Sequence, residues 1–205
     1  IGIGNYTLDA STTGTENTLM GADAGLNLTT GTRNTAVGYD ALTTATSAHD
    51  NVVIGYQAGV YMTSGGYNTL IGKIAGRDIT AGDDNVAIGF EAAANLEDGH
   101  GNSCLGRAAG EDLTTGGNNL CLGQNSGRSS SPSGSLTSHN DRICLGNNSA
   151  TDAYIKVSWT VTSDERDKTD IQDISTGLDF VNQLKPKSFW FRKERGSDVK
   201  HGAKR

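Results

Sequence analysis

Short apolar segments recur along the first three quarters of the chain at a fixed interval. In each segment two mostly apolar residues precede a glycine, as in NTLIG and NVVIG. Each run has only four or five residues and no 3.6-residue period, so it predicts a short strand rather than a helix. The central glycines are 17 residues apart at Gly4, Gly21, Gly38, Gly55, Gly72, Gly89, Gly106 and Gly123, and Gly146 follows after 23.

A strict repeat of this length predicts a solenoid in which each repeat forms one coil. We therefore expect a mainly β fold over residues 1–150, a parallel β-solenoid or β-roll with coils about 4.8 Å apart. The six extra residues of the last interval lie in SSSPSGSLTSHND, which predicts a surface loop.

Two neighbouring positions of the repeat are apolar and point to opposite faces of the strand. We expect the residue before the glycine, always a large aliphatic, to form the common core of the stacked coils. The residue two before the glycine is also apolar, so one apolar face is left to bury, and a homotrimer around a threefold axis would bury it. The residues before the glycine are Ile3, Met20, Val37, Ile54, Ile71, Ile88, Leu105, Leu122 and Leu145.

Three further positions carry small or polar residues with a physical role. The asparagine four places before the glycine predicts stacked side chains that bond to one another or to the turn backbone. The glycine suits a corner with positive φ or a close backbone approach, and an alanine three places after it suits coils in close contact. The asparagines are Asn17, Asn34, Asn51, Asn68, Asn85, Asn102 and Asn119.

Charge and composition exclude some functions. Residues 1–162 hold 7 Lys/Arg and 15 Asp/Glu, whereas residues 163–205 hold 10 and 8, so neither part has the basic excess typical of nucleic-acid binding. The sequence contains no run of 18 apolar residues, so it predicts no membrane span. Three cysteines, Cys104, Cys121 and Cys144, occupy core positions of the repeat, and the four histidines lack metal-ligand spacing. We expect no metal and no cofactor.

The repeat N-T-aliphatic-aliphatic-G-x-x-A-G, present over residues 1–150, resembles a known type of array. It is similar to the head repeats of trimeric adhesins and to arrays in phage tail fibres. The resemblance implies a trimeric, β-rich stalk or head.

A charged segment follows the repeats. Residues 151–162 predict a terminal strand and linker, and the signature S-D-x-R-x-K-x-x-I begins at Ser163. Residues 163–205 resemble the N-terminal part of the intramolecular chaperone auto-processing domain of phage tailspikes, of which the endosialidase tailspike domain is a member. The matching residues are Ser163, Asp164, Arg166, Lys168 and Ile171, then a short helix around Leu178, Val181 and Leu184, then Lys185-Pro186, Phe189 and Trp190.

This resemblance implies a small α+β domain that directs trimeric assembly and is then released by cleavage between Thr162 and Ser163. A serine hydroxyl needs a base, and Lys168 can serve if burial or neighbouring cations lower its pKa. Ser163 and Lys168 are thus the candidate catalytic dyad of a single-turnover serine endopeptidase acting in cis. Asp164 and Arg166 are supporting residues, and Arg166 or backbone N–H groups could stabilise the oxyanion.

The resemblance further implies a virion tail fibre or tailspike that attaches to a host cell and is assembled in the host cytoplasm. Its partners would be two further copies of the chain, other tail components and a host surface receptor, either a glycan or a protein. We expect this chain to be a piece of a longer protein, with the chaperone domain truncated. The alternatives are a bacterial trimeric surface adhesin without catalytic activity, and a solvated charge cluster at a domain boundary.

Overall fold

The computed structural model describes residues 1–153, 191–192 and 200–201. Residues 1–153 contain nine short strands and no helix. The strands are β1 Gly2–Ile3, β2 Thr18–Met20, β3 Thr35–Val37, β4 Val52–Ile54, β5 Thr69–Ile71, β6 Val86–Ile88, β7 Ser103–Leu105, β8 Leu120–Leu122 and β9 Ile143–Leu145.

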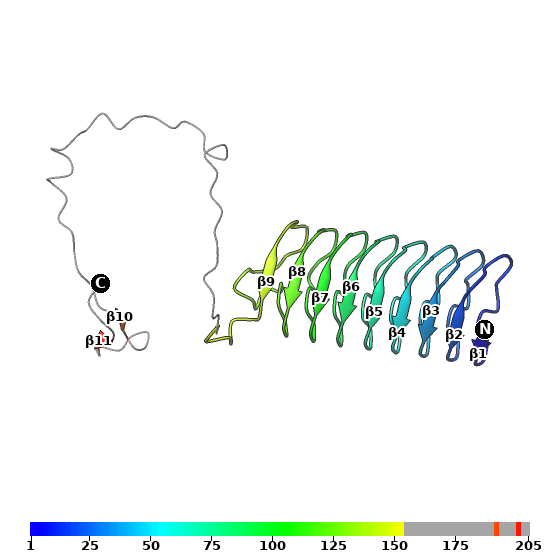
Figure 1. Cartoon of the computed structure of the whole chain (residues 1–205), viewed down its shortest axis with the longest axis horizontal. Coiled ribbons are helices and arrows are strands. Elements are labelled where there is room, and N and C mark those ends of the chain that lie inside the picture. The colour runs from blue at the N-terminus through cyan, green and yellow to red at the C-terminus, as the bar shows by residue number, and fades with distance from the viewer. Residues whose placement is uncertain (154–190, 193–199, 202–205) are drawn as a thin grey trace, which may run out of the picture. The chain divides into compact units, whose positions relative to one another are not determined.

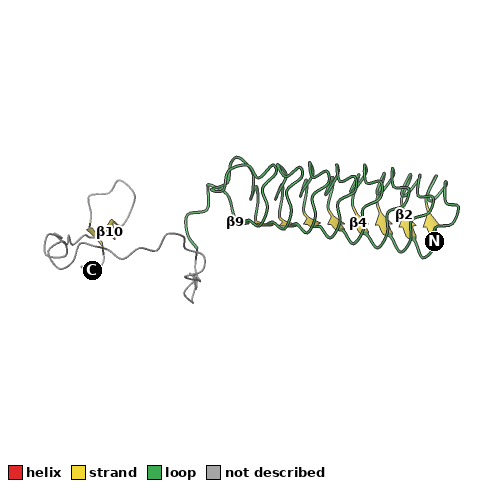
Figure 2. Cartoon of the chain, turned by 90° about the horizontal axis from the view of Figure 1, so that it is seen from above, coloured by secondary structure: helices red, strands yellow, loops and turns green. Residues whose placement is uncertain are grey.

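The nine strands form one parallel sheet in sequence order, and each coil returns the chain to the next strand (Figure 1). Equivalent residues pair across coils, so that Leu19 lies opposite Ala36 and Ala36 opposite Val53. Only the step from β8 to β9 is longer, because Cys121 pairs with Cys144. The prediction of a parallel β-solenoid of 17-residue coils is confirmed, and Figure 2 shows the strands aligned along one side of the coils.

The core of the solenoid is formed by the residue two places before the glycine, not by the residue directly before it. Leu19, Val53 and Leu70 are fully buried, whereas Met20 and Ile54 are 46% and 37% exposed. The prediction that the residue directly before the glycine forms the core was therefore wrong. Alternation along a strand separates two faces, but both faces are apolar here, so the pattern did not show which face points inward.

Two more columns complete the core. One is the predicted alanine three places after the glycine, which is fully buried in every complete coil from Ala24 to Ala109. The other lies seven places after the glycine and was not predicted; it includes Leu28, Met62, Ile79, Leu96 and Leu113, all fully buried.

Where one core position of a coil holds a small residue, a larger side chain at another position fills the space. In the third coil both core positions hold a small residue, Ala36 and Ala45, and the buried side chain of Leu42 enters from a position where neighbouring coils have glycine. Leu42 takes a left-handed φ of 57° to do so. A cavity in a close-packed core is costly, which accounts for a leucine in a conformation that leucine rarely adopts.

The asparagine column bonds in both ways that the sequence allowed. The side-chain Nδ2 of Asn51 donates to Oδ1 of Asn34 at 3.0 Å and to the carbonyl oxygen of Gly65 at 2.8 Å. The backbone N–H of Asn51 donates to the same Oδ1 at 3.2 Å. The contacts recur from coil to coil over seven asparagines that are at most 5% exposed. The column therefore ties each coil to the next and closes the turn.

The glycine at the end of each strand is required by both conformation and space. Gly55 has a φ of 142°, and a Cβ atom there would overlap the carbonyl oxygen of Gly72 in the next coil. Neighbouring coils thus approach backbone to backbone at this corner, as predicted.

The remaining described residues form a separate two-stranded antiparallel ladder. Strand β10, Phe191–Arg192, pairs with β11, Lys200–His201. Strand β10 lies within the segment KPKSFWFR, where a strand was predicted. Residues 151–153 of the predicted terminal strand and linker contain no strand, and the rest of that segment, 154–162, lies outside the described residues, as does the predicted helix around Val181. In the described residues no helix is long and apolar enough to span a membrane.

Candidate functional site

The predicted self-cleavage site lies outside the described residues. This applies to Thr162 and Ser163 at the predicted bond, to Lys168, and to the supporting residues Asp164 and Arg166. Their roles stay predictions. The described surface that carries functional information is the outer face of the solenoid.

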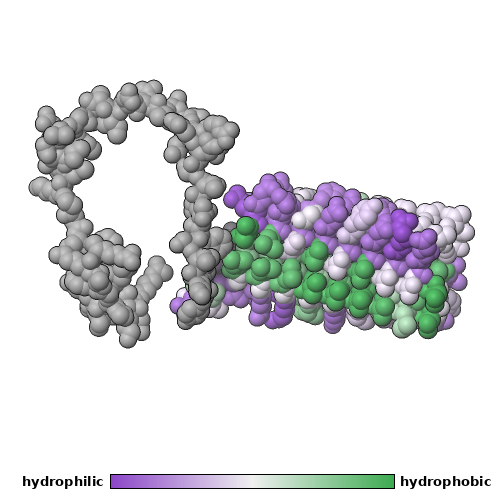
Figure 3. Space-filling view, in the orientation of Figure 1, coloured by the Kyte–Doolittle hydropathy of each residue, from purple (hydrophilic) through white to green (hydrophobic). Residues whose placement is uncertain are grey.

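The residues directly before the glycines form a continuous apolar ridge on the outer face. Figure 3 shows apolar residues running along the length of the solenoid. Ile3 is 55% exposed and Leu145 is 51% exposed, with the residues between them exposed or half-buried. A contiguous apolar surface of this length is unusual on a soluble monomer and indicates an interaction site.

Two flanks border the ridge. The upstream flank is the outward residue two places before the ridge, and it consists of Thr18, Thr35, Val52, Thr69, Val86, Ser103, Leu120 and Ile143. The downstream flank is the residue after each glycine, and it consists of Ala22, Tyr39, Tyr56, Lys73, Phe90, Arg107, Gln124 and Asn147.

The downstream flank contains a stack of aromatic and cationic side chains. The rings of Tyr39 and Tyr56 are stacked with centroids 5.5 Å apart and an interplanar angle of 17°. Lys73 Nζ lies 5.6 Å from the centroid of the Tyr56 ring and 5.7 Å from the centroid of the Phe90 ring. Arg107 Cζ lies 5.8 Å from the centroid of the Phe90 ring. Such cation–π contacts hold these long side chains in a fixed row.

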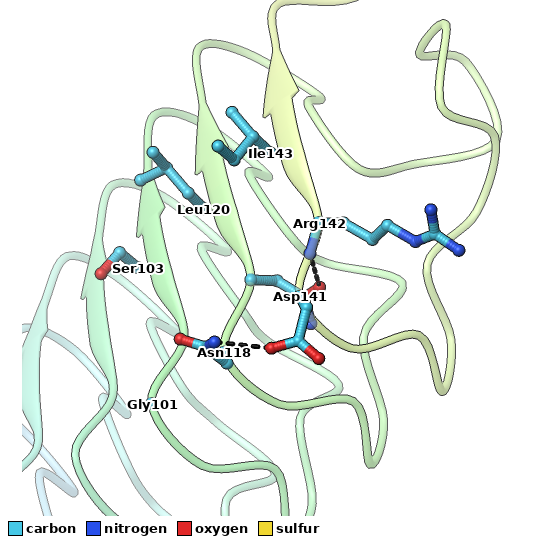
Figure 4. A pocket seen from close by; sticks show the side chains of 8 residues that line it. Gly101, Ser103, Asn118, Leu120, Asp141, Arg142 and Ile143 are labelled. Atoms are coloured by element: carbon cyan, nitrogen blue, oxygen red, sulfur yellow. Dashed lines mark hydrogen bonds between the residues drawn. The ribbon is translucent and has the colours of Figure 1, made fainter. Parts of the chain in front are cut away.

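A shallow hollow of about 400 Å³ opens at the upstream flank, beside β7, β8 and β9. In Figure 4 Ser103, Leu120 and Ile143 project to the same side of three successive strands, and Arg142 points away from them. Asn118 Nδ2 donates to Asp141 Oδ1 at 2.6 Å at the rim. The hollow exists because Gly101 and Ser103 are small. It offers an apolar wall and one carboxylate.

The three cysteines form a buried column in the core, as predicted. Cys104, Cys121 and Cys144 are free thiols that pair in register across β7, β8 and β9. A hydrogen bond with Cys121, together with burial, raises the pKa of Cys104 well above its ordinary value, and burial raises the pKa of Cys144. The same hydrogen bond lowers the pKa of Cys121. Because all three side chains are buried and contribute to the core, the column acts as apolar packing.

Charged groups elsewhere on the described coils form small ion-paired groups of two or three side chains. Arg33 Nε and Nη2 donate to the two carboxylate oxygens of Asp50 at 2.6 and 2.8 Å, and this bidentate bond lowers the pKa of Asp50. His49 Nδ1 lies 3.1 Å from the same carboxylate. Within residues 1–153, 191–192 and 200–201 no three His, Cys, Asp or Glu side chains are placed to hold a metal ion.

Comparison with known proteins points to the serine segment. Residues 163–203 match the family described as chaperone of endosialidase. The match begins at Ser163, the residue at which the sequence resemblance also begins, and it supports a chaperone domain after the solenoid. No curated protein and no solved structure matches the chain.

Sequence reasoning missed the downstream flank and the core column that contains Leu28. A signal existed for both. The position after the glycine holds a large aromatic or cationic residue in five consecutive coils, from Tyr39 to Arg107, and the position seven after the glycine is apolar in six consecutive coils, from Leu28 to Leu113. Both were hidden because they lie outside the strands, in the segments that read as turns.

Proposed function

We propose that this chain is part of a virion tail fibre or tailspike that attaches to a host cell, with a C-terminal chaperone that directs trimeric assembly and then cleaves itself off. The match of residues 163–203 to chaperone of endosialidase, directly after a solenoid with an exposed apolar ridge, carries this proposal. The same match favours a fibre over a bacterial surface adhesin. The receptor would be a glycan or a protein on the host surface.

The exposed ridge supports trimerisation. Large aliphatic side chains such as Ile3, Met20 and Leu145 are about half exposed, and burial of one such side chain stabilises by about 1.5–3 kcal/mol when complete. A parallel trimer would bring three ridges together along one axis. A chaperone that holds three chains in register would therefore favour the state in which these residues are buried.

Cleavage would proceed by attack of Ser163 Oγ on the carbonyl carbon of Thr162. Lys168, in its neutral form, accepts the hydroxyl proton, and an N–H donor or Arg166 stabilises the oxyanion. The C–N bond to Ser163 breaks, its nitrogen takes the proton from Lys168, and an ester remains between Thr162 and Ser163 Oγ. Water then hydrolyses the ester. A lysine is most easily neutral where it is desolvated, so a trimer interface would couple cleavage to completed assembly.

The test is the intact mass, under denaturing conditions, of the full-length gene product that contains this chain. We expect a product that ends at Thr162, and we expect the Ser163→Ala variant to stay uncut while Ser175→Ala, a serine in the same segment, is cut as the wild type is. Lys168→Met should also stay uncut. If Ser163→Ala is cut normally, or if the wild type stays whole while forming trimers, the self-cleavage proposal is wrong.

A further inference from the structure

The two flanks of the apolar ridge are complementary in size, coil by coil. Five consecutive coils have a small or β-branched residue on the upstream flank, from Thr35 to Ser103, and a large one on the downstream flank, from Tyr39 to Arg107. The relation reverses in the last coils, where Leu120 and Ile143 occupy the upstream flank and an amide side chain occupies the downstream flank. Within one subunit the ridge separates the two flanks, so contact between them does not account for this pattern.

A closed ring of three identical subunits supplies a reason. In a cyclic assembly the interface is heterologous: one surface of a subunit contacts a different surface of its neighbour. With three ridges on the axis, the upstream flank of one subunit faces the downstream flank of the next, and parallel chains in register place equivalent coils at the same height. Large side chains then meet small ones at the five levels from Thr35 to Ser103, as close packing requires.

We propose that the downstream flank packs against the upstream flank of the next copy of this chain, with Arg107 entering the hollow beside Asn118 and Asp141. This inference rests on the trimer of the proposed function and specifies how its subunits meet. The stack from Tyr39 to Arg107 is the protruding side of the contact. The ring of Tyr39 stacks on that of Tyr56, and Lys73 lies over the rings of Tyr56 and Phe90, which suits side-on packing rather than stacking on a ligand.

The hollow has the chemistry that Arg107 requires. Ser103 lies in the same coil as Arg107, and its small side chain leaves room for the arginine stem of the neighbouring copy. The apolar wall of Leu120 and Ile143 matches the methylene groups of such a stem, which arginine commonly buries while its guanidinium stays polar. Asp141, on the rim, supplies a carboxylate for the guanidinium.

The experiment is cysteine cross-linking of the full chain. Thr69→Cys and Lys73→Cys would be combined in one chain, oxidised under mild conditions, and separated on non-reducing gels. The native thiols are at most 5% exposed and need no removal. We expect covalent trimers from the double variant, and no covalent oligomer from either single variant or from the matched pair Ser64→Cys with Lys73→Cys.

The outcomes separate this inference from the proposed function. Trimers by native mass measurement without cross-linked species would overturn the flank contact and leave the trimer intact. Monomers by native mass would overturn both. For the hollow, Arg107→Asp and Asp141→Arg should each weaken the trimer by about tenfold, and the double variant should recover most of the loss. Absence of recovery would overturn the placement of Arg107.

Discussion

Replacing Asn68 by alanine tests whether the asparagine column holds the coils together. Asn68 is 1% exposed. Its Nδ2 donates to Asn51 Oδ1 at 3.0 Å and to the carbonyl oxygen of Gly82 at 2.8 Å, and its Oδ1 accepts from the backbone N–H of Asn85 at 3.0 Å. The Asn68 side chain is thus hydrogen-bonded to residues on both sides of it along the stack of coils.

The loss of stability on replacing Asn68 can be estimated from the groups that would be left without a hydrogen bond. Asn51 Oδ1 keeps the backbone N–H of Asn68 as a donor at 2.9 Å. The carbonyl of Gly82 and the N–H of Asn85 have no other hydrogen-bond partner in the described part of the chain. Two buried backbone groups would lose their bonds, at about 1–3 kcal/mol each. We expect Asn68→Ala to lower the free energy of unfolding by about 2–6 kcal/mol.

Urea unfolding followed by circular dichroism measures this change, and hydrogen exchange shows where it acts, because solenoids can open locally. The Asn85 amide should lose protection. Asn27 provides the matched control, since its Nδ2 donates to the Thr43 carbonyl at 3.0 Å on the exposed surface, and Asn27→Ala should cost less than about 0.5 kcal/mol. If Asn68→Ala costs no more than Asn27→Ala, the column does not stabilise the fold.

Two further substitutions test the corner and the core. Gly55→Ala should cost about 4 kcal/mol or more, because a Cβ there meets the Gly72 carbonyl, whereas Gly134→Ala, with a φ of 69° and open space, should cost about 1 kcal/mol; equal melting temperatures would refute the close approach. Burial raises the folded pKa of Cys144, so the native state disfavours its thiolate, and stability is full below the unfolded pKa near 8.5 and declines as pH rises above it. Melting temperature should therefore fall less between pH 7 and pH 10 in Cys144→Val than in the wild type, and parallel curves would contradict the raised pKa.

Much of the solenoid follows from local chemistry. A strand that contains Thr69 and Ile71 and ends at a glycine with positive φ turns the same way in each copy, so the period alone predicts equivalent pairing across coils. The asparagine column was predictable for the same reason: only a side chain with both a donor and an acceptor can bond to its own copy one coil away and also close a turn.

The serine segment was recognised from its residues, because Ser163, Arg166 and Lys168 occur at the spacing of a known signature. The flank surfaces were not recognised. Tyr39 and Tyr56 are 17 residues apart, and only coiling brings their rings to 5.5 Å. Neither residue belongs to a strand, so no alternation pattern drew attention to it.

By itself the sequence determined the length of the coil, the register between coils and the position of every corner, since these depend on neighbouring residues and on glycine and asparagine at fixed places. Which apolar face became the core was decided only by the tertiary structure. The interior of a narrow coil has a fixed volume that the residues of three core positions must fill together. The buried Leu42 beside the small Ala36 shows that a large side chain at one position compensates for a small one at another. The larger ridge residues, such as Ile54, remain outside.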